Sequence, residues 1–157
     1  MSDTLNAALQ RMSYGMYVVT VAVDGGATAF TASWVSQVSF EPPQVVLSVA
    51  RERFVNRILR KGKKFAVNII GQEQARLAAE YAGSGADDRL AEATLLEPQT
   101  TGAPVLADAL AYLDCQVQEV WETGDHTLFL GQVVSGQVLR EGHPLSTDNS
   151  NLRYRAG

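Results

Sequence analysis

The stretch ALAYLDCQVQEVWETGDHTLFLGQVVSGQV occupies residues 109–138 and contains two long runs of strand-forming residues. The first run spans about Ala109–Trp121 and the second spans His126–Val138. In the first run Leu113, Cys115 and Val117 alternate with polar residues, which is the pattern of a strand with one buried face. The residues between the runs, ETGD, are typical of a hairpin turn. We therefore predict a long antiparallel hairpin in this part of the chain.

Shorter runs of the same kind precede this hairpin. Asp24-Gly25-Gly26 is a strong signal for a second hairpin, and Phe40-Glu41-Pro42-Pro43 predicts a turn or an extended segment. Gly83–Thr101 is predicted as a loop region with at most one short strand at Thr94–Leu96. The further predicted strands are Met16–Asp24, Ala27–Ser33, Val45–Ala50 and Phe65–Ile70, and the predicted helices are Thr4–Met12, Phe54–Lys61 and Gln72–Ala82.

This order of elements predicts one mainly-β domain over residues 1–157. It has six or seven antiparallel strands, closed into a barrel, and two or three short helices that cap the ends. Strands and helices do not alternate regularly, which argues against a doubly wound parallel sheet.

Composition excludes several classes of protein. The net charge of −4 argues against a nucleic-acid partner. No run approaches about 18 apolar residues, so we expect no membrane span, and the first residues lack the pattern of a secretory signal. Cys115 is the only cysteine and there are two histidines, so we expect no internal disulfide, no metal site and a location in the reducing cytoplasm.

The sequence contains none of the motifs GxSxG, HExxH, CxxC or GxxxxGK[ST], and no GxGxxG follows a strand. The most unusual polar run is TASWVSQVS, residues 31–39. Its hydroxyls and backbone N–H groups, in a segment predicted to be irregular, suit a ligand with many acceptors, and Trp34 suits a planar one. A solvated loop is the alternative, and the residues alone leave both interpretations open.

Five segments in order along the chain resemble the flavin reductase family that has the FMN-binding split barrel. They include the S-x-S-x-x-P-P run and the G-D-H turn, and the likeness extends to the flavin reductase module at the C-terminal end of cyanobacterial diflavin flavodiiron proteins. The segments are SYGMYVVTV (13–21), TASWVSQVSFEPPQVVLSVA (31–50), KFAVNII (64–70), LADALAYLDCQV (106–117) and GDHTLFLGQVV (124–134).

The resemblance assigns roles to individual residues. Groups near Thr31, Ala32, Ser33 and Trp34 are expected to reach the phosphate and ribityl chain of FMN, and amides near Gln37, Val38 and Ser39 the pyrimidine edge of its ring. Arg51 and Arg53 stand where the family has a basic residue followed by hydroxyl residues, and they are expected to bind the phosphate instead. The alternative for both arginines is a solvated helix start.

His126 is the candidate catalytic residue, because the resemblance places it near the flavin and the nicotinamide. A histidine that only hydrogen-bonds its own hairpin turn is the alternative. The expected function is an NAD(P)H:flavin oxidoreductase that uses NADH or NADPH to reduce FMN, with FAD as the alternative flavin. Electrons would leave to free flavin, oxygen, or a di-iron or rubredoxin-like partner. The two alternative functions are an FMN-binding electron-transfer module and a barrel that binds no flavin. The resemblance also implies a homodimer.

Overall fold

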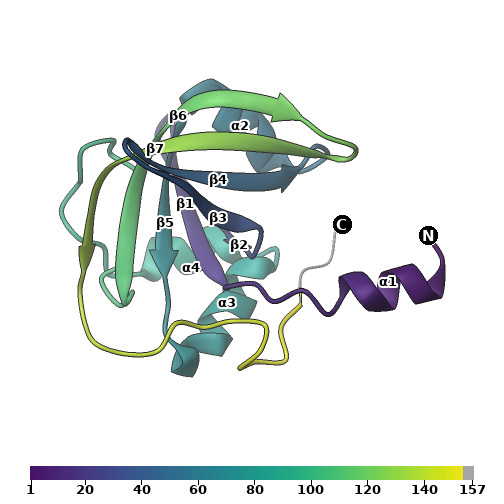
Figure 1. Ribbon diagram of the computed structural model, residues 1–157. Coiled ribbons are helices and arrows are strands. Elements are labelled where there is room, and N and C mark those ends of the chain that lie inside the picture. The colour runs from purple at the N-terminus through teal and green to yellow at the C-terminus, as the bar shows by residue number, and fades with distance from the viewer. Residues whose placement is uncertain (154–157) are drawn as a thin grey trace.

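The computed structural model describes residues 1–153, and one seven-stranded antiparallel sheet forms its body. Residues 154–157 of the predicted domain lie outside the described part. The sheet curls round, and its strands follow the spatial order β2-β1-β5-β6-β7-β4-β3 (Figure 1). The strands are β1 (Tyr17–Val23), β2 (Gly26–Ala32), β3 (Val35–Phe40), β4 (Pro43–Ala50), β5 (Lys64–Ile69), β6 (Ala111–Glu122) and β7 (His126–Val138). The mainly-β prediction is confirmed.

β2 and β3 follow each other in the chain but lie at the two edges of the sheet. Only Ser33 and Trp34 separate them, so the chain crosses from one edge to the other at this point. Within the described residues no ladder joins the two edges, so the barrel is split there rather than closed.

The predicted hairpin of β6 and β7 forms the longest ladder, from Ala111↔Val138 to Glu122↔Thr127. Its register shifts twice, at Asp114/Cys115 and at Val117/Glu119. Such bulges increase the local twist and bend the strand, which lets a sheet of this size wrap around its own core.

The core inside the curl combines buried side chains from six of the strands with the inner face of one helix, and Val35 of β3, which is partly buried, packs against it. Gly131 of β7 lies beneath Phe65, where an added Cβ would be 2.8 Å from the Phe65 Cζ atom. The most deeply buried members of this core include Val19, Val21, Leu47, Leu59, Phe65, Val67, Cys115 and Phe129.

The described residues form four α-helices and one 3-10 turn, one helix more than expected. They are α1 (Asp3–Leu9), α2 (Phe54–Gly62), η1 (Gln72–Gln74), α3 (Ala75–Ala82) and α4 (Ala86–Glu92). α2 contributes Val55 and Leu59 to the core inside the barrel, whereas α3 and α4 pack against β2. None of these helices is long and apolar enough to cross a membrane.

Two local predictions were wrong. The region Gly83–Thr101 contains α4, because Ala86 and Leu90 lie one turn apart and are buried beside α3; the strand expected at Thr94–Leu96 is only an isolated bridge between Leu95 and Leu106. The polar run is not an irregular segment either, since most of it belongs to β2 and β3 and pairing with β4 makes Val35–Phe40 a strand.

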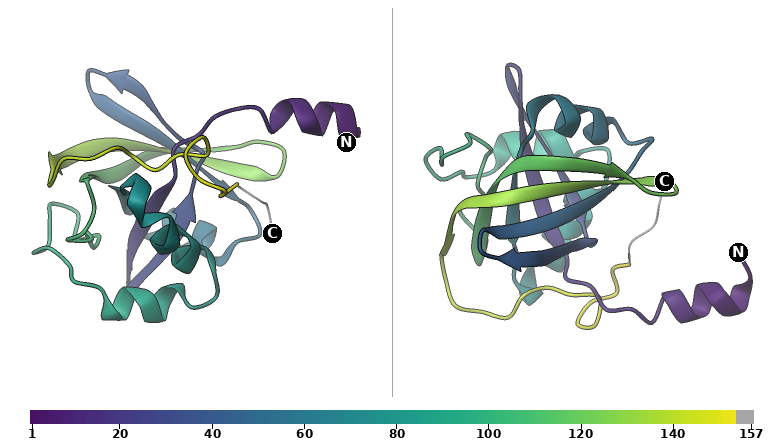
Figure 2. Two further views of the ribbon diagram at one scale, coloured as in Figure 1. Left: turned by 90° about the horizontal axis from the view of Figure 1, so that it is seen from below. Right: turned by 45° about the horizontal axis from the view of Figure 1, so that its top comes forward.

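α1 projects away from the body in every view (Figures 1 and 2), and none of its residues is buried. The Ser2 side chain caps its first turn by accepting a hydrogen bond from the Leu5 amide.

Candidate functional site

Three aromatic side chains from distant parts of the chain form a row at the crossing between β2 and β3. The rings of Trp34 and His126 lie 4.7 Å apart between centroids with an interplanar angle of 39°, and Tyr14 lies 6.2 Å from Trp34. The Trp34 carbonyl accepts a hydrogen bond from the Ser48 amide, which places Trp34 beside β4. His126 starts β7 and pairs with Ala50 at the end of β4. Tyr14 has no role in the sequence-based prediction.

His126 is 4% exposed and is held by its own hairpin turn. Its Nδ1 atom lies 2.6 Å from the Asp125 carboxylate, and its carbonyl accepts hydrogen bonds from the amide and hydroxyl of Thr123. The hydrogen bond with His126 holds the pKa of Asp125 below its ordinary range, so this carboxylate is ionised at neutral pH. An ionised acceptor requires Nδ1 to carry a proton, which fixes the orientation and tautomer of the ring. His126 therefore both bonds its turn and stacks on Trp34.

The predicted cofactor residues of β2 and of the crossing are buried or half-buried. Thr31 donates its hydroxyl to the Ala78 carbonyl of α3, so that hydroxyl proton is already used within the chain. Ala32 and Ser33 are buried, and the Ser33 hydroxyl has no hydrogen-bond partner among the described residues. Burying a hydroxyl without a partner is costly, so this group is a candidate to bind a ligand atom.

The predicted cofactor residues of β3 are more exposed. β3 is an edge strand that pairs with β4 on one side, and on its other side no strand of the described chain pairs with it. The side-chain amide nitrogen of Gln37 donates to the Ser39 carbonyl. Val38 lies at a register shift in the ladder with β4, and 52% of its surface is exposed. Unpaired backbone groups along such an edge are donors and acceptors for a ligand.

The two arginines after β4 have different surroundings. Arg51 donates from its guanidinium to the Gly124 carbonyl, and its Nε atom lies 3.9 Å from the Glu122 carboxylate, so it contacts the turn that carries His126. Arg53 occupies the N-cap position of α2, and its guanidinium lies 5.2 Å from the centroid of the Phe30 ring.

Arg53 also lines a cavity of about 310 Å³ between β2, the start of α2 and the turn between α3 and α4. Phe30, Phe54, Ser84 and Asp87 contribute to its wall. This volume lies at the lower end of the range of small-molecule sites. Arg53 thus lines a cavity, whereas Arg51 contacts the turn that carries His126.

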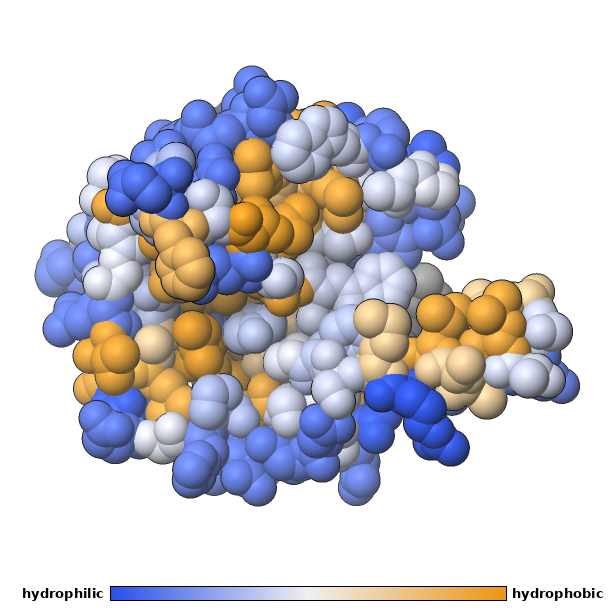
Figure 3. Space-filling view, viewed as in Figure 1, coloured by the Kyte–Doolittle hydropathy of each residue, from blue (hydrophilic) through white to orange (hydrophobic). Residues whose placement is uncertain are grey.

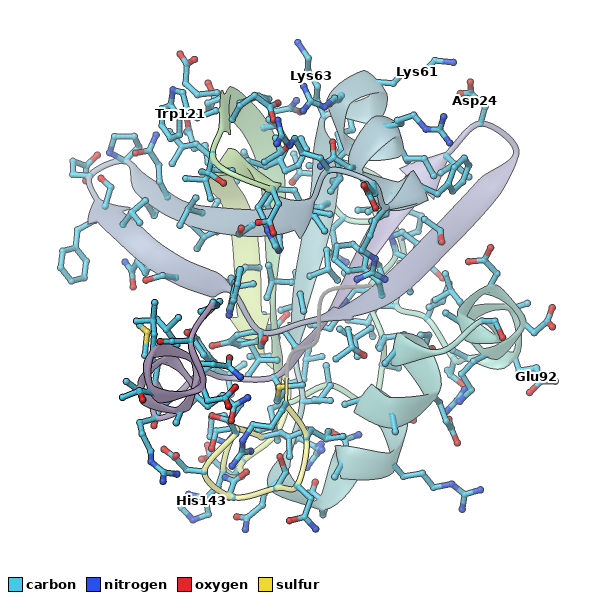
Figure 4. All side chains as sticks on the ribbon, turned by 90° about the vertical axis from the view of Figure 1, so that its right-hand side faces the viewer. Asp24, Lys61, Lys63, Glu92, Trp121 and His143 are labelled. Atoms are coloured by element: carbon cyan, nitrogen blue, oxygen red, sulfur yellow. The ribbon has the colours of Figure 1, made fainter. Side chains whose placement is uncertain are left out.

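The single cysteine and the second histidine are not among the residues of this row. Burial raises the pKa of the Cys115 thiol to about 12, as expected for a cysteine that packs in the core. His143 lies at the opposite end of the molecule from Trp121 and Lys63 (Figure 4). Among residues 1–153 no group of three or more histidine, cysteine, aspartate or glutamate side chains could hold a metal ion.

Comparison with known proteins identifies the family of the chain. The family model described as flavin reductase like domain matches residues 9–155. The putative diflavin flavoprotein A 6 of Nostoc sp. (strain PCC 7120) is 38% identical over 143 residues, which are 89% of this chain and 25% of the relative. The chain thus spans about a quarter of the length of this relative.

A second relative has a more similar length. The reductase component of the 4-nitrophenol 4-monooxygenase/4-nitrocatechol 2-monooxygenase of Rhodococcus opacus is 37% identical, over 84% of this chain and 69% of the relative. Among solved structures, the NADH:FAD oxidoreductase SgcE6 of Streptomyces globisporus, in complex with NAD and FAD fragments, has a TM-score of 0.82 at 27% identity, covering 90% of this chain and 85% of that one. The chain therefore belongs to the family of flavin reductase-like domains.

Proposed function

We propose that this protein is an NAD(P)H:flavin oxidoreductase that passes a hydride from a reduced nicotinamide to a flavin held beside Trp34 and His126. The observation that carries the proposal is the buried hydroxyl of Ser33, which has no partner among the described residues and directly precedes Trp34 in the crossing between the sheet edges. Family membership supports it, because a related protein is described as an NADH:FAD oxidoreductase and another as a reductase component.

The residues present fit a flavin. Ala32, Ser33 and Trp34 offer backbone groups and the Ser33 hydroxyl to the phosphate and ribityl chain, and Thr31 would act through its backbone because its hydroxyl proton is used by Ala78. The free edge of β3 at Gln37, Val38 and Ser39 suits the hydrogen-bonding pyrimidine edge. Arg53, which lines a cavity with Phe30 of β2, and Arg51, beside the His126 turn, are the two candidate phosphate ligands.

A bound flavin, FMN or FAD, would supply the hydride acceptor and the redox chemistry. The task of the chain is then to position the reactants and to favour negative charge. Neutral donors along residues 31–39 stabilise such charge without a formal cation. His126, oriented by the ionised Asp125, presents its imidazole beside Trp34, where the proposed flavin would lie.

The test is the visible spectrum and NADH consumption of the purified protein. We expect a bound or titratable flavin whose absorbance bleaches on addition of NADH or NADPH without oxygen, and steady NADH oxidation when free FMN is added. His126→Gln should lower that rate, and His143→Gln is the control, because His143 is exposed and is not part of the row of aromatic side chains. If the protein binds flavin but oxidises NADH no faster than free FMN does without protein, the proposed enzymatic activity is refuted.

Flavin binding without NADH oxidation would favour an FMN-binding electron-transfer module. The diflavin flavoproteins support this alternative, because the chain spans only about a quarter of the length of the one compared above. In this case the reduced flavin should pass its electrons to a di-iron or rubredoxin-like partner, so adding the oxidised partner to the chemically pre-reduced protein should reoxidise the flavin and reduce the partner.

We also propose a homodimer. α1 projects with Leu5 and Leu9 about half exposed, and apolar side chains gather on it (Figure 3). On β7, Leu128 and Leu130 are partly exposed, on the same face of the sheet as His126. Light scattering should give the mass of two chains, and a monomer at micromolar concentration would refute this part of the proposal.

A further inference from the structure

A polar cluster beneath the hairpin turn is centred on Arg60 of α2. The Arg60 Nε atom donates to the Asn56 side-chain oxygen at 2.8 Å, and one terminal nitrogen donates to the Thr127 hydroxyl at 2.9 Å. The same nitrogen forms an ion pair with the Glu122 carboxylate. One guanidinium thus connects three groups on two separate parts of the fold.

One side of the cluster fixes the end of β4. Asn56 is 1% exposed, and its amide nitrogen donates to the carbonyls of Val49 and Ala50 at 3.2 and 3.3 Å. Since Asn56 also accepts from Arg60, the position of this arginine is coupled to the last residues of the strand.

The other side fixes the hairpin of β6 and β7. Glu122 and Thr127 face each other in the ladder, and the Thr127 hydroxyl lies 3.1 Å from the Glu122 carboxylate. The hydrogen bond from Arg60 is the main reason that the pKa of Glu122 lies below its ordinary range, so the carboxylate is ionised at neutral pH.

His126 lies between these two anchored points. It precedes Thr127 in the chain and pairs with Ala50 across the ladder, and both of these residues are tied to Arg60, directly or through Asn56. Alternation along β7 places the Thr127 side chain on the opposite face of the sheet from His126. The cluster therefore holds the backbone of His126 from the opposite face of the sheet, while the His126 ring contacts the Trp34 ring.

We propose that Arg60 is a positioning residue whose guanidinium, with Asn56, Glu122 and Thr127, fixes His126 against Trp34. Only an arginine fork reaches all three acceptors; a lysine keeps the charge but has a single donor nitrogen. The effect on hydride transfer rests on the proposed function, whereas the coupling of Arg60 to the Trp34–His126 stack does not.

The first test uses Trp34 as the reporter. In a Trp121→Phe background Trp34 is the only tryptophan, since the chain has two. Contact with an imidazole, most strongly with a protonated one, quenches indole fluorescence, so in spectra recorded at mildly acidic pH Arg60→Lys should raise the emission towards the level of His126→Gln. The matched control is Arg57→Lys on the same helix, where the guanidinium lies over the Phe54 ring, and it should keep the parent emission.

Emission of Arg60→Lys equal to that of the parent would overturn the proposal. If Arg60→Lys does not fold cooperatively, Glu122→Gln removes the other charge of the same ion pair and is expected to raise the emission in the same way. An unchanged emission in that folded variant counts equally against the proposal.

The second test is a double-mutant cycle on NADH oxidation with FMN. Arg60→Lys should lower kcat about tenfold, roughly the effect of one lost charged hydrogen bond, with little change in KM. The same substitution should have almost no effect when His126 is already glutamine. Effects that multiply would show that Arg60 acts independently of His126. If no variant and no parent oxidises NADH, the proposed function fails, and the emission of Trp34 alone decides the positioning role.

Discussion

Replacing Ser33 by alanine should make the flavin-free protein more stable and the flavin complex weaker. Ser33 is 2% exposed, and its hydroxyl has no hydrogen-bond partner among the described residues. Alanine removes this hydroxyl and leaves the Cβ atom and the surrounding packing in place. The folded protein therefore loses a costly polar group, and a ligand loses one contact.

The two magnitudes follow from hydrogen-bond energetics. A buried polar group without a partner costs about 1–3 kcal/mol, so Ser33→Ala should stabilise the flavin-free protein by about 1 kcal/mol. For a chain of this size that corresponds to a rise in Tm of roughly 2–4 °C. One neutral hydrogen bond contributes about 0.5–1.5 kcal/mol, so the Kd for FMN should increase about 2- to 12-fold.

Both quantities can be measured on one preparation. Calorimetry of the flavin-free protein gives Tm, and quenching of FMN fluorescence on titration gives Kd. Ser36→Ala is the matched control, because Ser36 lies in the same run but is exposed, with its hydroxyl bonded to the neighbouring Gln37 carbonyl. Its stability should change by less than about 0.5 kcal/mol. A Ser33→Ala protein that is less stable and binds FMN as tightly as the parent would refute the reasoning.

Three further predictions concern the core and the hairpin. Cys115, whose thiol pKa is raised to about 12 by burial, should not react with a thiol reagent at neutral pH until the protein is unfolded; rapid reaction of the native protein would contradict its burial. Gly131→Ala should destabilise the protein by about 1–3 kcal/mol in a denaturant titration, because its Cβ would lie 2.8 Å from Phe65; an unchanged midpoint would mean that the ring moves freely. Folding lowers the pKa of Glu122, chiefly through its hydrogen bond with Arg60. This pairing therefore stabilises the protein at pH values above the ordinary pKa of a glutamate, and the stabilisation is lost as the pH falls through the lowered pKa. The Tm difference between the parent and Glu122→Gln should therefore be present at neutral pH and vanish on acidification, and a difference independent of pH would exclude the ion pair as its cause.

The sequence by itself determined the local elements whose signals are local. Alternation along Leu113–Val117 and the turn residues of ETGD and Asp24-Gly25-Gly26 specified two hairpins, and both are present. Strand pairing and turn chemistry depend on near neighbours, so a single sequence contains the necessary information. The ordered motifs likewise identified the family, because a motif is recognised from the residue types along the chain and needs no knowledge of three-dimensional distances.

Tertiary structure decided what depends on distant neighbours. Residues 33–40 have the composition of a loop, yet pairing with β4 makes most of them an edge strand. Ala86 and Leu90 give too weak a helical pattern for prediction, and burial of both beside α3 stabilises α4.

The site shows the same division. The sequence placed Trp34 in a candidate binding run and His126 at a hairpin turn, but nothing in their local patterns indicates that the two rings are in contact or that Tyr14 joins them. That contact exists because the sheet curls through the bulges of β6 and returns β7 to the side of β4, where the chain crosses from β2 to β3. Arg60 is the same case, since its neighbours in the sequence give no indication of its partners, and only the folded chain brings Glu122 and Thr127 to it.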